Sequence, residues 1–260
     1  MSSPARELAL LEDAARAAGD IALRRFGRAL DVKEKAGGAG PVTLADLEID
    51  RMLRAELTAA RPGYGWLSEE SRDTPARLDA ARVFIVDPID GTRAFIAGEK
   101  TWAHSLALAE GGRVIAAVVH LPKLERTYVA SAGGGARANG AAITASDREG
   151  LDDSRVLANA AQLDPRHWRG EAPRLERHMR PSLAYRLCLA AEGRFDAMLT
   201  FRDAWEWDVA AGDLIAREAG AVVTDRTGAA AVYNNPRPMV PGMIVAGPAL
   251  HAAILARVGA

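Results

Sequence analysis

The chain has 260 residues, of which 49% are hydrophobic and 26% charged, and its formal net charge is −1. This length and composition are typical of a globular protein that buries a substantial core. The balanced charge argues against a nucleic-acid polymer as partner, because proteins that bind one usually carry a basic excess. The N-terminus lacks the pattern of a signal peptide, and no apolar run approaches the ~20 residues of a membrane span. We therefore expect a soluble, cytoplasmic protein.

Helices and an antiparallel sheet are predicted in the first half of the chain. Apolar residues at helical spacing predict a helix over about 5–26. The glycine-rich segment 31–46 indicates a mobile loop, and Thr43 within it is suited to cap a second helix that ends near Arg61. Strands are then expected over residues 83–87, 103–109, 113–121 and 126–131. The signal Asn139-Gly140 predicts a hairpin turn.

Strands and helices alternate in the second half, which predicts an α/β layer. The expected strands are 155–160, 195–201, 221–225 and 242–247, and the expected helices are 182–193, 207–220 and a last one through Arg257. We place the boundary between the halves so that they span 1–135 and 136–260. The single cysteine, Cys188, lies in an apolar helical pattern and is expected to be a buried thiol.

The apolar strand from Val83 runs into Asp87-Pro88-Ile89-Asp90-Gly91-Thr92. Pro88 cannot donate to a sheet ladder, and Gly91 allows tight backbone geometry. A turn here can aim both carboxylates at one point, where they repel unless a cation lies between them. Oxygen ligands without histidine or cysteine favour Mg²⁺, Mn²⁺ or Ca²⁺ over zinc. The alternative reading is a turn with capping aspartates.

Three further motifs carry carboxylates, namely Ser68-Glu69-Glu70-Ser71, Trp207-Asp208 and Thr43-Leu44-Ala45-Asp46. Each alone can be a helix cap or an exposed acid. Together with residues 87–92, they resemble the inositol monophosphatase family of magnesium-dependent phosphatases. The family signatures D-P-[IL]-D-G-T, G-E-E-S, W-D-x-A-A-G and V-T-x-x-D occur here in positions that fit the family's order and spacing, over nearly the whole chain, although Ser68 replaces the usual glycine.

The resemblance implies a layered α-β-α-β-α sugar-phosphatase fold and a phosphomonoesterase that uses two or three Mg²⁺ ions, with Mn²⁺ as a substitute. It implies that one ion is held by Glu70, Asp87 and the Ile89 carbonyl, and a second by Asp87, Asp90 and Asp208. Asp46, together with Glu70, is placed for a third ion. Thr92 with Glu70 and Asp46 would orient the attacking water, and the N–H groups of Gly91 and Thr92 would cradle the phosphate.

A rival enzyme class is the haloacid dehalogenase type of phosphatase, which uses D-x-D-G-T with an aspartate nucleophile. Here the spacing is D-x-x-D-G-T, one residue longer, which displaces Asp90 from the acid/base position. We therefore favour attack by metal-activated water. Two other classes, a non-catalytic metal or phosphometabolite sensor and a purely structural domain, remain as alternatives. The presence of every acidic position argues against the sensor.

The resemblance implies that the substrate is a small phosphorylated metabolite. Glu206-Trp207-Asp208 and the segment from Ser182 to Arg186 resemble the 3'(2'),5'-bisphosphate nucleotidase branch, although Pro181 stands where glycine is usual and Arg186 where lysine is common. Candidate substrate contacts on this basis are Gly91, Thr92, Ser182, Ala184, Arg186, Glu206 and Lys35. Lys33 competes with Lys35 for a role in closing over the phosphate, and an exposed helical arginine is the alternative for Arg186.

Other members of the family hydrolyse inositol-1-phosphate, histidinol phosphate or fructose-1,6-bisphosphate, and these activities stay open as alternatives. Gly40-Pro41 stands where inositol phosphatases commonly carry an acid, which weakens that reading. His104 is expected to be a structural histidine, with a substrate contact as the alternative. The resemblance also implies a homodimer and inhibition by Li⁺.

Overall fold

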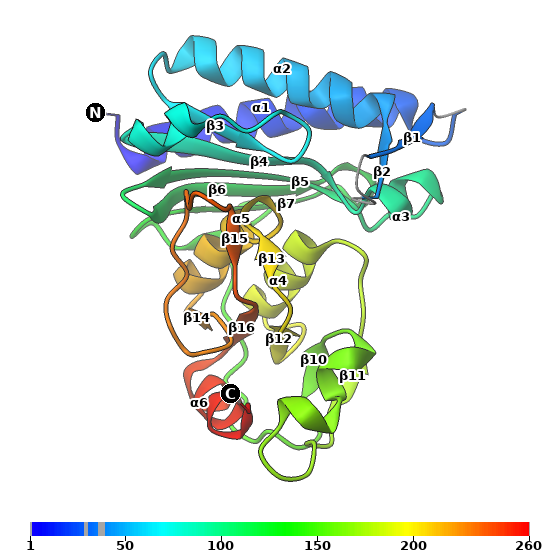
Figure 1. The fold of residues 1–260 in the computed structure, drawn as a ribbon, viewed down its shortest axis with the longest axis vertical. Helices are drawn as coiled ribbons and strands as arrows, with labels where there is room; N and C mark the ends of the chain where they lie inside the picture. Colours follow the sequence, from blue (N-terminus) through cyan, green and yellow to red (C-terminus); the bar gives the residue numbers. More distant parts are fainter. Residues whose placement is uncertain (1, 29–30, 36–39, 260) are drawn as a thin grey trace.

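A computed structural model describes residues 2–28, 31–35 and 40–259 of the chain, which fold into five alternating layers (Figure 1). Helices α1 and α2 cover a seven-stranded sheet, helices α4 and α5 lie beneath it, and a five-stranded sheet and helix α6 follow. This is the α-β-α-β-α architecture that the sequence led us to expect. Residues 36–39 of the predicted mobile loop lie outside the described residues.

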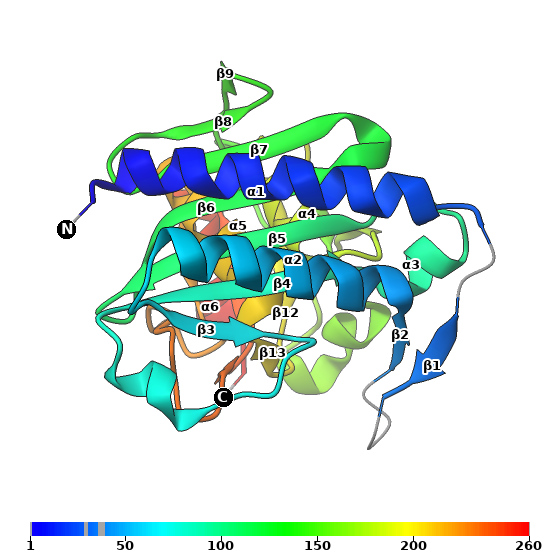
Figure 2. The ribbon, with the colours of Figure 1, turned by 90° about the horizontal axis from the view of Figure 1, so that it is seen from above.

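The outer layer consists of α1 (Pro4–Arg25) and α2 (Leu44–Ala60), which run side by side across the sheet (Figure 2). Thr43 caps α2 as predicted, and its side chain and that of Asp46 form a reciprocal capping box. The apolar faces of both helices, with Leu11 and Leu53 fully buried, pack on one face of the sheet. Burial of this stripe fixes the helices in place.

The large sheet has the order β3-β4-β5-β6-β7-β8-β9. Its strands are β3 (Gly65–Ser68), β4 (Arg82–Asp90), β5 (Ala103–Glu110), β6 (Arg113–Leu121), β7 (Arg126–Ser131), β8 (Ala136–Ala138) and β9 (Ala141–Ala142). The expected antiparallel pairing holds from β4 to β9, with Asn139 and Gly140 at the predicted hairpin turn. Strand β3 instead pairs in parallel with β4, because the connection between them returns the chain to the same end of the sheet.

Helices α4 (Leu183–Ala191) and α5 (Glu206–Glu218) pack on the other face of this sheet. All nine residues of β4 are buried, as expected for a strand covered on both faces. Cys188 is a fully buried thiol in α4, as predicted. The sheet extends to Ala142, beyond the boundary at residue 135 that we drew from the sequence.

The second sheet has the order β11-β10-β12-β16-β14 and packs against α6 (Pro248–Arg257). Its strands are β10 (Arg155–Leu157), β11 (Glu176–His178), β12 (Ala197–Thr200), β14 (Val222–Thr224) and β16 (Met243–Ala246). Two small pairs complete the fold, β1 (Val32–Glu34) with β2 (Pro41–Thr43) and β13 (Ala204–Trp205) with β15 (Met239–Val240). A short helix, α3 (Thr92–Ile96), follows β4.

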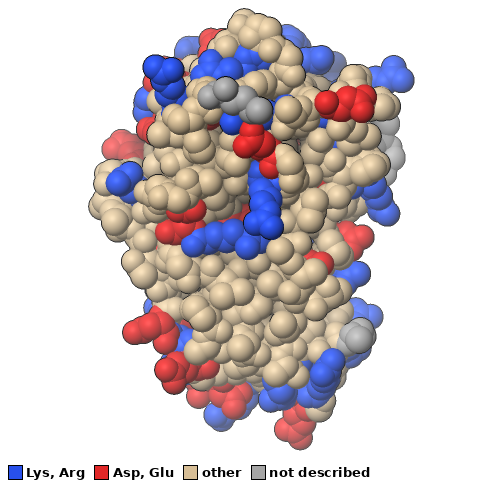
Figure 3. Space-filling model, turned by 90° about the vertical axis from the view of Figure 1, so that its left-hand side faces the viewer, with Lys and Arg blue, Asp and Glu red and all other residues tan. Residues whose placement is uncertain are grey.

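Positive and negative side chains are interspersed on the face seen in Figure 3, so this face carries no extended basic surface. Such a surface would be the electrostatic signature of a nucleic-acid partner. Among the described helices, none combines the length and apolar character needed to cross a membrane.

Candidate active site

A β-bulge lies at the end of β4, where the acidic motif begins. Asp87 pairs with Ser105 and Asp90 with Ala103, so that Pro88 and Ile89 together stand opposite the single residue His104. In a regular strand, residues three apart point to opposite faces of the sheet. The extra residue restores the alternation, so both aspartates face α4 and α5 while Ile89 packs under α1 and α2. The bulge therefore explains how D-x-x-D places two carboxylates on one side.

Helix α4 holds Asp90 in place. The Ser182 hydroxyl and the Ala184 N–H both donate to Oδ2 of Asp90, each at 2.6 Å. Ser182 is also the N-cap of α4, so the carboxylate lies at the start of this helix, where a negative charge is favoured. Ser182 and Ala184, which we expected to contact substrate, are thus occupied with Asp90.

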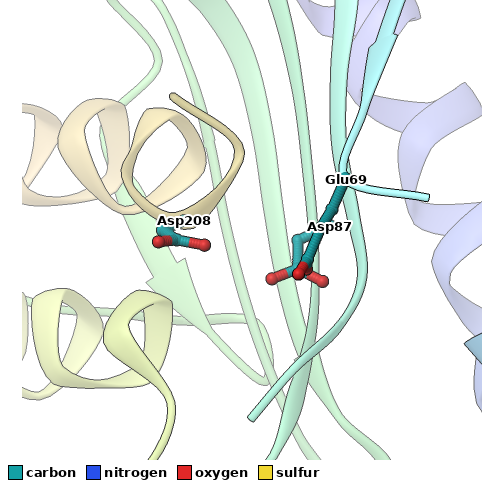
Figure 4. Close-up of side chains that lie close together, drawn as sticks. All are labelled: Glu69, Asp87 and Asp208. Carbon is teal, nitrogen blue, oxygen red and sulfur yellow. The ribbon is translucent and has the colours of Figure 1, made fainter. Parts of the chain in front are cut away.

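Three carboxylates from separate elements approach one another beside this bulge (Figure 4). Glu69 follows β3, Asp87 lies near the end of β4, and Asp208 lies in the first turn of α5. One oxygen from each lies within 4.8 Å of the other two. Helix α5 is anchored here because the Ser105 hydroxyl donates to the Trp207 carbonyl at 2.9 Å.

The charges in this group oppose one another. Burial, and then the charges of Glu69, Asp90 and Asp208, raise the pKa of Asp87 well above its usual range. Burial and the charges of Asp90 and Glu69 do the same to the pKa of Asp208. Such buried like charges are costly without a compensating cation. The donors are all hard carboxylate oxygens, so the group fits Mg²⁺ or Mn²⁺.

The structure brings Glu69, and not Glu70, into this group. The N–H of Glu69 donates to the Val86 carbonyl at 3.2 Å, which continues the pairing of β3 with β4 and sets Glu69 beside Asp87. Glu70 is not one of these three carboxylates and accepts instead from Nζ of Lys35 at 2.6 Å. Burial raises the pKa of Glu70 to about 7, although Lys35 partly offsets the effect.

Lys35 contacts both glutamates, because its Nζ also lies 2.6 Å from Oε1 of Glu69. Burial alone would lower the pKa of Lys35, but the two carboxylates raise it above its ordinary value. The competing candidate Lys33 lies on β1 with an exposed side chain. Of the two, the structure places Lys35 beside the acidic group.

Asp46 and Thr92 lie together at the junction of α2 and α3. The Thr92 hydroxyl is 3.3 Å from Oδ1 of Asp46 and 3.1 Å from the Ile89 carbonyl, to either of which it can donate its proton. Asp46 is fully buried, and its Oδ2 accepts from the N–H and the hydroxyl of Thr43. Burial raises the pKa of Asp46, while these hydrogen bonds lower it in part.

A pocket of about 450 Å³ opens beside these residues. It is lined by Gly40, Pro41, Glu69, Gly91, Thr92, Arg93, Ala94, Asn159, Met179, Pro181, Arg186 and Arg202. Gly91 has a φ of 98°, which only glycine adopts readily, and it starts helix α3. The expected substrate residues Gly91, Thr92 and Arg186 therefore share one pocket.

Three arginines give this pocket a basic wall. Arg186 is only 3% exposed, and Arg93 and Arg202 are exposed. Burial lowers the pKa of Arg186, and the negative charge of Asp90 counteracts the shift. A pocket lined by guanidinium groups, and by Glu69 of the acidic group, suits an anionic ligand.

Glu206, the remaining substrate candidate, lies outside the pocket lining and is fully buried. Its carboxylate accepts from the N–H groups of Asn234 and Asn235 and from the Asn235 side chain, at 2.7–2.9 Å. It therefore holds the turn at these asparagines against the start of α5, and we no longer propose it as a substrate contact.

The roles of Glu69 and Arg202 were not predicted from the sequence. A signal for Glu69 existed, because strand alternation from buried Leu67 puts Glu69 on the face that Asp87 shares. Ser68 then faces α2, where its hydroxyl donates to Asp50. Arg202 follows β12 in a loop, and no local pattern relates it to the acidic motifs.

Comparison with known proteins agrees with this geometry. A model of the inositol monophosphatase family matches residues 5–259. The inositol-1-monophosphatase of Rhizobium meliloti is 36% identical over 241 residues, which cover 88% of this chain and 87% of that protein. The fructose-1,6-bisphosphatase/inositol-1-monophosphatase of Thermotoga maritima is 34% identical and covers 82% of each. The structure of the extragenic suppressor protein SuhB from Bartonella henselae, 29% identical, superposes with a TM-score of 0.82 and covers 96% of this chain and 97% of that one.

Proposed function

The chain belongs to the inositol monophosphatase family and is a phosphoric monoester hydrolase, and we propose that it hydrolyses a small phosphorylated metabolite that carries a second anionic group. The observation that carries the proposal is the pocket that Glu69 lines together with Arg186 and Arg202. Its carboxylate side fits hard cations, and its arginine side fits an anion.

The proposed metal ligands combine the group of Glu69, Asp87 and Asp208 with the ligand set that the family resemblance implies. Glu69, Asp87 and the Ile89 carbonyl would hold one ion, and Asp87, Asp90 and Asp208 a second, with Mg²⁺ as the physiological ion and Mn²⁺ as a substitute. Glu69 thereby takes the place that the sequence resemblance gave to Glu70. Asp46 and Glu70 border the same region, where a third ion remains a prediction.

When bound, such cations supply neutralising charge for a phosphate dianion and lower the pKa of a water molecule. The protein's own groups do the rest. The Thr92 hydroxyl, which contacts both Asp46 and the Ile89 carbonyl, would orient water on the phosphate. The N–H groups of Gly91 and Thr92 lie where α3 starts, at the pocket wall, and would donate to phosphate oxygens.

The second anionic group would meet Arg186 and Arg202. Guanidinium groups bind phosphate or carboxylate through paired hydrogen bonds. This preference would be met by 3'(2'),5'-bisphosphate nucleotides, which the sequence resemblance favours, and by fructose-1,6-bisphosphate, which is consistent with the name of the Thermotoga maritima relative.

Inositol-1-phosphate is the second candidate, because the Rhizobium meliloti relative is named for this activity. It has no second anion, so it would leave Arg202 without a partner. Histidinol phosphate is a third member of the test set, since its amine gives it the opposite charge beside the phosphate.

The test is a comparison of kcat/KM on adenosine 3',5'-bisphosphate, fructose-1,6-bisphosphate, inositol-1-phosphate and histidinol phosphate with Mg²⁺ present. We expect the two bisphosphates to be hydrolysed most efficiently, and EDTA to abolish all release of phosphate. A clear preference for inositol-1-phosphate would refute the second-anion proposal while leaving the phosphatase assignment intact.

A stereochemical test separates the two phosphatase mechanisms. Hydrolysis of a substrate with chiral phosphate should invert the configuration at phosphorus, since attack by water is a single displacement. Retention, or a trapped phosphoaspartate, would favour the rival aspartate nucleophile.

Three further expectations come from the family resemblance and stay predictions. Millimolar Li⁺ should inhibit turnover, and unchanged activity at tens of millimolar would contradict this. The chain should form a homodimer, which sedimentation analysis can decide. We also expect it to reside in the cytoplasm.

A further inference from the structure

His104 occupies the position opposite the β-bulge. Pro88 and Ile89 of β4 stand against this one residue of β5, so the bulge leaves backbone groups outside the regular ladder. Pro88 has no N–H, and therefore only its carbonyl needs a partner there. The ring of His104 supplies that partner, because its Nδ1 contacts the Pro88 carbonyl.

The contact fixes the tautomer of His104. A carbonyl can only accept, so Nδ1 must carry the proton. The other ring nitrogen, Nε2, is buried and has no hydrogen-bond partner among the described residues. The side chain is completely buried, and burial lowers its pKa to about 3, which keeps it neutral.

The neighbours of His104 restrict its movement. Its ring lies edge-on to Trp102, with centroids 5.6 Å apart, and stacks on His120 at 6.0 Å. Trp102 in turn packs edge-on against Phe95 of α3. A ring held on both sides in this way presents its Nδ1–H to the bulge in one orientation.

The Pro88 carbonyl lies between two proposed metal ligands, Asp87 and the Ile89 carbonyl. A rotation of the peptide that carries the Pro88 carbonyl also turns the N–H of Ile89, which donates to Oδ1 of Asp87 at 3.0 Å. Fixing this carbonyl therefore fixes the orientation of the Asp87 carboxylate.

We propose that His104 is a positioning residue for the metal site, whose Nδ1–H holds the β-bulge in the shape that aims Asp87 and Asp90 at the same cations. The inference rests on the proposed function, because it presupposes that these aspartates bind metal. It gives a role to the buried histidine for which sequence alone favoured a purely structural one.

Two substitutions of similar bulk test the proposal. His104→Asn keeps an N–H donor near the position of Nδ1, whereas His104→Leu removes the donor. His120→Leu is the matched control, since His120 pairs with His104 across the sheet and its Nδ1 contacts the Thr127 hydroxyl instead. All three variants remove one ring of the stacked pair His104 and His120, so a loss of packing alone should affect all three in the same way.

The readouts are Mn²⁺ affinity by electron paramagnetic resonance, kcat and KM, and the thermal midpoint. We expect His104→Leu to weaken Mn²⁺ binding by about tenfold or more, which is typical for loss of a group that orients a metal ligand. Its kcat should fall in parallel. His104→Asn and His120→Leu should stay near the wild-type affinity.

Wild-type Mn²⁺ affinity in His104→Leu, with only a lower thermal midpoint, would show a merely structural histidine and overturn the inference. Equal losses in the Asn and Leu variants would also overturn it. Failure of the wild-type protein to bind Mn²⁺ would instead refute the proposed function.

A spectroscopic test applies if His104→Leu does not fold. In the wild-type protein, ¹⁵N spectra of the imidazole should show that Nδ1 of His104 is protonated and that its Nε2 is unprotonated. The opposite tautomer would exclude a hydrogen bond from Nδ1 of His104 to the Pro88 carbonyl and would overturn the proposal.

Discussion

The ammonium group of Lys35 lies 2.6 Å from Oε1 of Glu69. Glu69 is one of the three carboxylates that approach one another at the ends of β3, β4 and α5. A positive charge from the protein therefore already neutralises part of the group that fits a metal ion. This relationship makes Lys35 a competitor of the cation for the same oxygen.

Replacement of Lys35 by Met should tighten Mn²⁺ binding in the absence of substrate. The gain should be about fivefold, because an ion pair of this kind contributes ~1 kcal/mol. Isothermal titration calorimetry measures it directly. Lys33→Met, at an exposed site on β1, is the control and should leave the affinity unchanged. Weaker binding in Lys35→Met would show that the lysine supports the metal site.

Substitution of the two neighbouring glutamates should have unequal effects. Glu69→Gln removes a ligand from the carboxylate group and should lower kcat by about 10²-fold or more, with a matching loss of Mn²⁺ affinity. Glu70→Gln changes one of the two carboxylate partners of Lys35, leaves the three-carboxylate group intact and should cost far less. Each variant replaces a carboxylate by an amide of nearly the same size and shape, so the two substitutions can be compared directly. The reverse order would restore Glu70 as the metal ligand.

Asp87→Asn should abolish activity yet stabilise the protein without metal. Asp87 is buried beside Glu69, Asp90 and Asp208, and one fewer negative charge relieves their repulsion. A relief of ~1 kcal/mol raises the melting temperature by about 2–4 °C in a chain of this size. Calorimetry in EDTA checks this, with exposed Asp79→Asn as the control. A lower melting temperature would mean that the carboxylate is already protonated or compensated.

Arg202→Ala should reduce kcat/KM for adenosine 3',5'-bisphosphate by about 10–100-fold, the usual weight of a charge-assisted hydrogen bond or two. It should change kcat/KM for inositol-1-phosphate little. Arg202 is preferred over Arg186 for this test because Arg186 lies within the field of Asp90. Exposed Arg194, beyond the end of α4, provides the control. Equal losses on both substrates would place Arg202 at the hydrolysed phosphate.

His120 should contribute a loss of unfolding free energy as the pH drops from about 6.5 towards 4, opposite in sign to the contribution of the buried carboxyls whose pKa values are raised. Burial, and then the charge of Arg16, lower the pKa of His120 to about 4, while Asp20 counteracts them and His104 stacks on its ring. The unfolded chain binds a proton near pH 6.5, so it gains protons in this window that the folded chain does not. The slope from one such histidine is at most ~1.4 kcal/mol per pH unit.

His120→Asn tests this pH dependence, because it removes the titrating group while keeping a polar side chain. Urea denaturation at several pH values should show that the free energy of unfolding of the wild type falls relative to that of the variant as the pH drops through this window. Identical slopes between pH 7 and 4 would show that His120 does not contribute.

The sequence by itself determined the reaction class, through its family resemblance, and the local structure around two of its acidic motifs. Local signals were enough for this, since the capping pair Thr43 and Asp46 starts α2 and the D-P-I-D-G-T segment ends a buried strand. Periodicity likewise predicted α1, the antiparallel strands and the hairpin at Asn139, because each depends on contacts between near neighbours in the chain.

Tertiary structure decided which groups meet. The parallel pairing of β3 with β4 set Glu69 beside Asp87, and the packing of α4 turned Ser182 and Ala184 towards Asp90. Glu206 accepts hydrogen bonds from a turn that begins 28 residues later in the chain. Arg202, in the loop after β12, lines the pocket. These outcomes depend on contacts between residues far apart in sequence, and hydrophobic burial of the layers, rather than any local pattern, fixes them.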